Sequence, residues 1–300
     1  AGNHNNLIGL PLTVLSTPED TEVLVLELGM NHAGEITRLT SVARPTVAVI
    51  TNVGTSHIGL LGSRENIARA KAEIVSGMRA FDSIEPTLIQ ASAGDYTKFI
   101  ADEFARPACV VCKTVGATEA DVMSAQQVTL DEEGLPTATI VAASGWSRTV
   151  TLEVPGRVVV DDLLLALEAI ETLGLDLDAA AEAIEQMPAT RMRLSVLDAP
   201  CGAKIIDDSY NASPNSTAAA LDVLMQMPAV GRRIALIGEI GELGPEEKRL
   251  HGYVGAYIAA KDPDLVAFVG TGAAREMVEA ARVMGFSEDK IEQFSDVNEA

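Results

Sequence analysis

Short apolar runs that alternate with helical stretches dominate the first 120 residues of the chain. Glu22–Leu28 (EVLVLEL) and Thr46–Val53 are continuous apolar or β-branched runs, of a length typical of buried parallel strands. Between them, Gly34–Ala43 carries apolar residues at helical spacing, and Pro45 ends that helix. Strand, helix and strand in this order form a βαβ unit. The pattern therefore predicts an α/β fold with a parallel sheet.

The alternation continues beyond this unit. We expect a helix after Ser63, because serine is a good N-cap and apolar residues then recur at helical spacing. The elements predicted next are a strand at Thr87–Ala91, a helix around Asp95–Phe104 and a strand at Ala108–Val111. Cys109 and Cys112 form a CxxC inside the apolar run ACVVC, with no second pair to complete a zinc site. We interpret them as strand core rather than as a redox or metal pair.

From residue 121 the apolar period changes from helical spacing to two. Asp121–Pro155 alternates in this way and is broken by turn signals at Glu133-Gly134 and Ser144-Gly145, which predicts a small antiparallel addition to the sheet. Asp161–Leu173 and Asp178–Met187 follow as two helices, the first ended by Gly174.

A second α/β domain is predicted after a linker at Pro188–Arg193. Its predicted strands are Lys204–Asp208, Arg233–Ile237 and Leu265–Val269, and its predicted helices begin near Pro214, Pro245 and Ala273. Proline is favoured in the first turn of a helix, which supports two of these helix starts. We therefore expect one domain at residues 1–188 and another at 189–300.

Composition and charge narrow the function classes. The chain has 300 residues, is 47% hydrophobic and carries a formal net charge of -21, which argues against nucleic-acid binding through a basic surface. No apolar run approaches the length of a membrane span, and AGNHNN lacks the pattern of a secretory signal. We expect a cytoplasmic protein without a membrane-inserted segment.

Lys71 is the first candidate for chemistry, because it falls on the predicted apolar stripe of the helix after Ser63. A buried ammonium is costly, so it must shift its pKa, pair with an acid or be chemically modified. His57 lies in the preceding loop, and Glu27 ends the predicted strand Glu22–Leu28. Polar groups at the carboxyl edge of a parallel sheet predict a cation or phosphate site. Two alternatives stay open: a structural ion pair between Glu27 and Lys71, and a loop histidine held by the backbone.

A second candidate segment is AKIIDDSYNASPNS at residues 203–216. An apolar strand runs into acids, and Ser213-Pro214 then begins a helix whose free N–H groups could hold an anion. Asp207, Tyr210 and Asn211 could orient a nucleotide there. The alternative is an ordinary strand-to-helix turn rich in asparagine and proline. GEIGELG at 238–244 lacks the GxGxxG spacing and is not interpreted as a dinucleotide site.

Together these segments resemble a known family. GNHNNLIGLPLTVL, VLVLELGMNHAGEI, VAVITNVGTSHIGLLGS, IARAKAEI and IIDDSYNASPNS have the order and spacing of the Mur ligases of peptidoglycan synthesis, over nearly the whole chain. ELGMNHAGEI and DDSYNASP are most similar to the members that join D-alanyl-D-alanine to UDP-N-acetylmuramoyl-tripeptide. Folylpolyglutamate synthase shares the overall plan, but GMNHAGEI and SYNASP speak against it.

The resemblance implies a fold and a reaction. The fold is a P-loop-type parallel-sheet central domain followed by a Rossmann-like C-terminal domain. ATP phosphorylates the tripeptide carboxylate to an acyl phosphate, which the dipeptide amine attacks with the help of magnesium. Glu27 and His57 match the magnesium ligands, and Lys71 matches a lysine carried as a carbamate. Asn31 and Asn52 match residues beside the phosphates, Arg193 a linker arginine, and Asp207, Tyr210 and Asn211 contacts to nucleotide and dipeptide. Family members usually act as monomers.

The sequence also departs from the family pattern. The phosphate-binding GxxxxGK(S/T) loop that precedes GNHNN in the family is missing, as is the domain that holds the UDP-sugar, and the chain stops at Ala300. We therefore expect a fragment that cannot catalyse ligation alone; a catalytically inactive binding module is the alternative. Val158, Asp161 and Asp162 stand where the family has a histidine and amides near adenine. An ionised acid only accepts hydrogen bonds, so it lacks the donor that an amide would offer.

Overall fold

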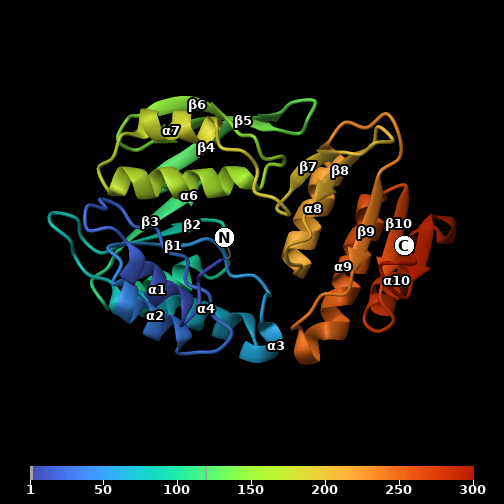
Figure 1. The fold of residues 1–300 in the computed structure, drawn as a ribbon, viewed down its shortest axis with the longest axis horizontal. Coiled ribbons are helices and arrows are strands. Elements are labelled where there is room, and N and C mark those ends of the chain that lie inside the picture. Colours follow the sequence, from blue (N-terminus) through green and yellow to red (C-terminus); the bar gives the residue numbers. More distant parts are fainter. Residues whose placement is uncertain (1–2, 119) are drawn as a thin grey trace. The chain divides into compact units, whose positions relative to one another are not determined.

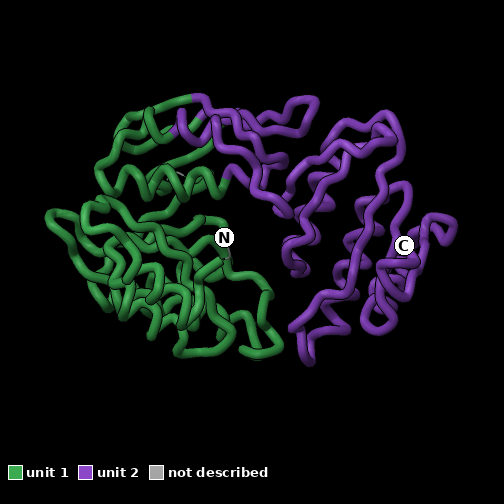
Figure 2. The backbone as a smooth tube through the Cα atoms, viewed as in Figure 1, with its two compact units in different colours: residues 1–126, 140–148, 161–180 green, residues 127–139, 149–160, 181–300 purple. Residues whose placement is uncertain are grey.

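The computed structural model describes residues 3–118 and 120–300. The chain divides into two compact units, which Figure 2 shows in different colours. The first comprises residues 1–126, 140–148 and 161–180, and the second residues 127–139, 149–160 and 181–300. The two units are described separately below. The predicted boundary between residues 188 and 189 stays a prediction.

A six-stranded sheet in the order β1-β2-β3-β4-β5-β6 forms the centre of the N-terminal half of the sequence (Figure 1). Its strands are β1 (Val47–Ile50), β2 (Thr87–Ala91), β3 (Val111–Gly116), β4 (Met123–Leu130), β5 (Pro136–Ala142) and β6 (Ser147–Thr151). β1, β2 and β3 pair in parallel, with Val47 opposite Thr87 and Thr87 opposite Val111. The α/β fold with a parallel sheet is thus confirmed.

The period-two stretch forms the other end of this sheet. Turns at residues 131–135 and 143–146 connect β4 to β5 and β5 to β6, and such short loops join antiparallel strands. Gly134 and Gly145, at the two predicted turns, have φ angles of 77° and 95°. A side chain there would be strained, so both glycines are required by the turn geometry.

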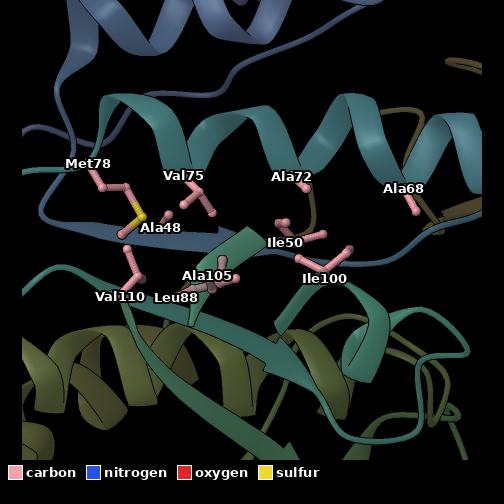
Figure 3. Packing of buried hydrophobic residues seen from close by; sticks show 10 residues of the cluster. All are labelled: Ala48, Ile50, Ala68, Ala72, Val75, Met78, Leu88, Ile100, Ala105 and Val110. Atoms are coloured by element: carbon pink, nitrogen blue, oxygen red, sulfur yellow. The ribbon is translucent and has the colours of Figure 1, made fainter. Parts of the chain in front are cut away.

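Helices accompany the parallel strands in the predicted alternation. They are α1 (Gly9–Ser16), α2 (Glu35–Ala43), α3 (Ile58–Leu61), α4 (Arg64–Ala72), the 3₁₀ helix η1 (Glu73–Gly77), α5 (Thr97–Ile100), the π-helix η2 (Ala101–Ala105), α6 (Val159–Thr172) and α7 (Leu177–Glu185). Figure 3 shows the packing of α4 and η1 on the sheet. Ala68, Ala72 and Val75 point toward Ala48 and Ile50 of β1. This apolar contact fixes α4 on the sheet.

The expected strand at Glu22–Leu28 is wrong. These residues form no strand, and within the described chain their backbone groups form no ladder. A strand exists only where a neighbour supplies the hydrogen bonds, and apolar content alone does not supply one. The side chains of Val23, Leu24 and Val25 are consequently exposed, Val25 to 88%.

The predicted strand at Ala108–Val111 is displaced toward the C-terminus. The turn that ends the preceding helix continues through Cys109, whose N–H donates to Arg106 O and whose φ is 58°. Cys109 is exposed and Cys112 is half-buried in β3, so the interpretation of both as strand core is wrong for Cys109. A single apolar run covers both the turn that ends the helix and the start of β3, so the sequence pattern does not show where one ends and the other begins.

A buried ion pair joins β3 to α6. Lys113 Nζ lies 2.8 Å from Glu168 Oε1, and the side chain of Glu168 is almost completely inaccessible. Its Oε2 has no hydrogen-bond partner in the described part of the chain. Burial raises the pKa of Glu168, while the hydrogen bond from Lys113 opposes that rise.

Replacing Lys113 by methionine is expected to destabilise the chain by about 3–5 kcal/mol at neutral pH, because a buried carboxylate then loses its counter-charge. The loss should shrink as pH falls, since Glu168 binds a proton more tightly in the folded than in the unfolded state. Urea unfolding at several pH values measures this. The double variant Lys113→Met/Glu168→Leu should recover most of the loss; if it is no more stable than Lys113→Met, the uncompensated charge is not the cause.

The second unit contains a three-stranded parallel sheet in the order β11-β10-β9 and a separate antiparallel hairpin. The hairpin is β7 (Ser195–Asp198) and β8 (Lys204–Asp207). The remaining elements are α8 (Pro214–Gln226), β9 (Ile234–Gly238), η3 (Gly244–Glu246), α9 (Glu247–Lys261), β10 (Leu265–Val269), α10 (Ala274–Val283), η4 (Glu288–Lys290) and β11 (Ile291–Phe294). α9 packs on both α8 and α10.

Two strands of this unit, β7 and β11, were not predicted. β7 is short and ends in exposed residues, and in β11 Glu292 and Gln293 interrupt the apolar pattern. Each forms because a neighbouring strand, β8 or β10, supplies its ladder. The predicted helix start at Pro214 is confirmed by a capping box, in which Ser213 and Ser216 cap each other's backbone.

Candidate functional site

Lys71 lies on α4, whose start is fixed by the Ser63 side chain accepting a hydrogen bond from Asn66 N–H. Its amino group has no hydrogen-bond or ion-pair partner among residues 3–118 and 120–300. Burial lowers the pKa of Lys71 from its ordinary value of 10.5. No ion pair with Glu27 forms, so of the two interpretations of Glu27 the structural pair with Lys71 is wrong. A partly enclosed amine with a lowered pKa is a reactive amine.

Glu27 is held by two asparagines of the N-terminal GNHNN segment. Asn3 Nδ2 donates to both carboxylate oxygens at 3.0 Å, and Asn5 Nδ2 donates to Oε1 at 2.9 Å. Gly29 permits this arrangement, because a Cβ there would lie 2.8 Å from Asn5 Nδ2. The amides fix the carboxylate but leave lone pairs free, since an ionised carboxylate accepts about four hydrogen bonds.

The loop that carries Asn31 is held by a second carboxylate. Glu35 Oε2 accepts hydrogen bonds from Asn31 N–H at 2.6 Å and His32 N–H at 3.0 Å. These two bonds lower the pKa of Glu35, with a smaller electrostatic contribution from His32. The backbone N–H of Asn31 is thus occupied, while its side chain is exposed.

Asn52 and His57 lie in the loop between β1 and α3. Asn52 is exposed, and His57 adopts the left-handed conformation with a φ of 62° directly before α3. A non-glycine residue in this conformation is uncommon. The conformation determines the direction in which the imidazole side chain projects from the backbone. No three side chains of the types His, Cys, Asp and Glu are arranged to hold a metal in the described part of the chain. The predicted set of Glu27, His57 and Lys71 includes a lysine, so this absence does not test it, and it stays a prediction.

The C-terminal candidates include a compact pair. The guanidinium of Arg193 stacks on the ring of Tyr210 at 4.2 Å from the ring centre, and Tyr210 N–H donates to Met192 O. Asp208 Oδ1 accepts from Leu194 N–H. Burial raises the pKa of Asp208, and the bond from Leu194 and the charge of Arg193 oppose the rise. The structure thus brings Arg193 and the DDSYN segment together, while their predicted roles toward nucleotide and dipeptide stay predictions.

Asp207 and Asn211 use their side chains differently. Asp207 Oδ1 accepts from Ser209 N–H and Oγ, which closes a local turn, and Asn211 Oδ1 accepts from Ala212 N–H. Asp207 also lines a cavity of about 430 Å³ in the second unit, together with Arg191, Ser195 and Lys204. Asn211 contributes to the local turn and does not line this cavity.

Asp161 and Asp162 stand in the first turn of α6. Loss of solvent raises the pKa of both carboxyl groups, and the charge of Asp161 raises that of Asp162 further. Both residues are nevertheless partly open to solvent, and they stand side by side at the start of α6.

Sequence reasoning missed the residues that hold the site loops: Asn3, Asn5, Glu35 and Glu73. The signal was present in the density of asparagine in GNHNN and in acids placed among apolar positions of GEI and AEI. Buried or half-buried polar side chains need partners, so such residues mark contacts between segments.

Two family models match this chain. Residues 1–170 match the Mur ligase middle domain, and residues 192–300 match the Mur ligase glutamate ligase domain. The chain belongs to the Mur ligase family. The predicted family and the predicted α/β fold with a C-terminal α/β domain are both confirmed.

Individual relatives are similar in sequence and structure. The UDP-N-acetylmuramoyl-tripeptide–D-alanyl-D-alanine ligase of Bacillus subtilis is 36% identical over 298 residues, which cover 96% of this chain and 61% of the relative. The crystal structure of MurF from Acinetobacter baumannii superposes with a TM-score of 0.89 at 29% identity, over 100% of this chain and 61% of that one. MurF from Thermotoga maritima in complex with ADP gives 0.80 at 26% identity, over 98% and 63%. The chain thus spans about three-fifths of these Mur ligases.

Proposed function

We propose that the protein is part of an ATP-dependent ligase that joins D-alanyl-D-alanine to UDP-N-acetylmuramoyl-tripeptide in peptidoglycan synthesis. The observation that carries this proposal is the match over 96% of the chain to a relative with that name. The tripeptide carboxylate takes the γ-phosphoryl group of ATP, and the dipeptide amine then displaces phosphate to form the amide. No helix in the described residues is long and apolar enough to cross a membrane. We expect the protein to act as a monomer in the cytoplasm.

The candidate residues suit a magnesium site in their donor chemistry. Glu27 supplies carboxylate oxygens, which magnesium prefers, and His57 supplies a nitrogen. The unpartnered amine of Lys71 can react with carbon dioxide, losing a proton and forming a carbamate whose oxygens complete an acidic set. When bound, magnesium neutralises negative charge on the phosphate oxygens.

The other candidates have roles in holding nucleotide and substrate. Asn31 and Asn52 offer exposed side-chain amides toward the phosphates. Arg193 and Tyr210 form a planar stack, and such a stack suits a base or a phosphate. Asp207 and Asn211 shape the turn that follows β8.

The test uses the complete open reading frame that encodes these 300 residues. We expect phosphate release that requires ATP, magnesium, D-alanyl-D-alanine and the UDP-linked tripeptide together, with the amide product seen by mass spectrometry. The 300-residue chain alone should release none, because it carries no GxxxxGK(S/T) segment. Product formed with glutamate in place of the dipeptide would instead support a folylpolyglutamate synthase-like ligase. No product with any of these substrates, from a folded protein, would leave a binding module as the better explanation.

A further inference from the structure

The segment that follows Lys71 makes a contact that the proposed reaction does not yet explain. Glu73, two residues after Lys71, directs its carboxylate to the first turn of α2. Oε1 accepts from Gly34 N–H at 2.7 Å, and Oε2 accepts from Thr37 N–H at 3.0 Å and Thr37 Oγ at 3.1 Å. One side chain thus caps a helix that lies 36 or more residues away in sequence.

This contact is unusual as a helix cap. The residue before α2, Gly34, has a φ of 87° and no side chain, so α2 has no cap of its own. Free N–H groups at a helix start favour a negative charge, and Glu73 supplies it from another element. Nearby, Thr40 Oγ donates to Ile74 O, and a Cβ on Gly77 would overlap Thr40. η1 and α2 are therefore in direct contact along their length.

The same first turn continues into the loop that carries Asn31. Glu35 holds Asn31 and His32 from one side, and Glu73 holds Gly34 from the other. The backbone N–H groups of three of the four residues from Asn31 to Gly34 therefore donate to two carboxylates. Upstream, Asn5 O accepts from Gly29 N–H and its amide holds Glu27. Moving Glu73 would release one end of this series.

We propose that Glu73 is a positioning residue, which fixes the Asn31–Gly34 loop to the segment that carries Lys71. The proposal rests on the proposed function for its effect on ligation. Glu73 makes its three hydrogen bonds to Gly34, the residue before α2, and to Thr37 in α2, so we assign it no contact with the reacting groups. Through these bonds, Glu73 sets the distance from the Lys71 amine to Asn31 in the loop and to Glu27. Mutation of a residue that holds a metal ligand in place typically lowers metal affinity or activity about 10–100-fold.

The first test is made on the 300-residue chain and needs no activity. In Glu73→Ala, hydrogen exchange of the backbone amides of residues 31–37 should accelerate at least about tenfold, since Gly34 and Thr37 lose their acceptor. Glu73→Gln, which keeps the side-chain length and one acceptor oxygen, should give an intermediate rate. Glu65→Ala is the matched control, because Glu65 lies on α4 but bonds only exposed Arg69. Unchanged exchange of residues 31–37 in folded Glu73→Ala would overturn the proposal.

The second test uses the enzyme from the complete reading frame. Glu73→Ala should lower kcat about 10–100-fold and raise the magnesium concentration that gives half-maximal rate, while the KM for D-alanyl-D-alanine stays unchanged. Glu73→Gln should recover part of both effects. A loss of rate that merely follows the loss of folded protein, with unchanged magnesium dependence, would overturn the positioning role. An inactive wild type would refute the proposed function instead, and the exchange experiment would still decide the role of Glu73.

Discussion

Replacing Lys71 by methionine is expected to stabilise the 300-residue chain and to lower strongly the ligation rate of the complete enzyme. The Lys71 side chain is half-buried and its amino group has no partner in the described part of the chain, so its charged form opposes folding. Methionine keeps the length and flexibility of the side chain and removes the charge. Thermal unfolding in carbon dioxide-free buffer should show a higher Tm, by about 2–4 °C for each kcal/mol of cost relieved.

The pH dependence identifies the cause. Because the folded-state pKa of Lys71 is lowered, the unfolded chain binds more protons between that pKa and 10.5. Wild-type stability relative to the variant therefore rises with pH across this window, and the advantage of methionine disappears near pH 10.5. Lys98→Met is the control, because Lys98 is 86% exposed on the same unit and pairs with Asp102, so its removal should not stabilise the chain. A pH-independent advantage would show that packing, not charge, separates the two chains.

The loss of activity tests the chemical role of the same residue. Lys71→Met and Lys71→Ala should lower kcat by about 10²–10³-fold, the loss typical when one preorganised electrostatic contact to a transferring group is removed. With the smaller alanine, added formate or acetate should restore part of the rate, because a free carboxylate can occupy the place of a carbamate. Labelled carbon dioxide should give a carbamate carbon signal in wild type and none in either variant. Normal activity of Lys71→Ala would contradict the carbamate assignment.

Replacing Gly255 by alanine is expected to cause one of the largest losses of stability available in the second unit. Gly255 is buried in α9, where an added Cβ would lie 2.7 Å from Met277 C and 2.8 Å from Met277 Cα on α10. Both are backbone atoms, so no side chain can rotate away and the two helices must separate. Overpacking of this kind costs about 1–3 kcal/mol, and more where the backbone is the obstacle.

Gly252 on the same helix provides the matched control. An added Cβ there would meet only Ala280 Cβ, at 4.0 Å, which is ordinary contact. Alanine forms helices better than glycine by about 1 kcal/mol, so Gly252→Ala should be neutral or stabilising. Urea unfolding should show a large loss of stability in Gly255→Ala and no loss, or a gain, in Gly252→Ala. Equal shifts would mean that helix propensity, and not the close contact of α9 with α10, governs the response.

How far the sequence predicted this molecule depends on whether a feature is local. Ser63, Pro214 and Gly174 mark helix ends through bonds within a few residues, and these ends lie where they were predicted. Glu22–Leu28 has the composition of a strand, but pairing depends on a neighbour that composition cannot reveal. The same limit explains why β11 was missed, since β10 supplies its ladder.

The same contrast between local and long-range features applies to the candidate site. The residue types at Lys71, Glu27 and Tyr210 were recognisable because a charge or polar ring stood where the local pattern did not need one. The residues that hold them were not, because Asn3 reaches Glu27 across 24 positions and Glu73 reaches Thr37 across 36. Such contacts depend on the tertiary fold, and no local period records them.

The backbone of Glu22–Leu28, which has no strand partner in the described part of the chain, also affects how the isolated chain behaves in solution. Three adjacent large aliphatic side chains are exposed beside backbone groups that form no ladder in the described part of the chain, so they offer a second molecule a template for intermolecular strand pairing. The strongly negative charge opposes this by repulsion between molecules, and salt weakens that repulsion. Aggregation of the purified chain should therefore increase with ionic strength. Storage at low salt is preferable for the measurements described above.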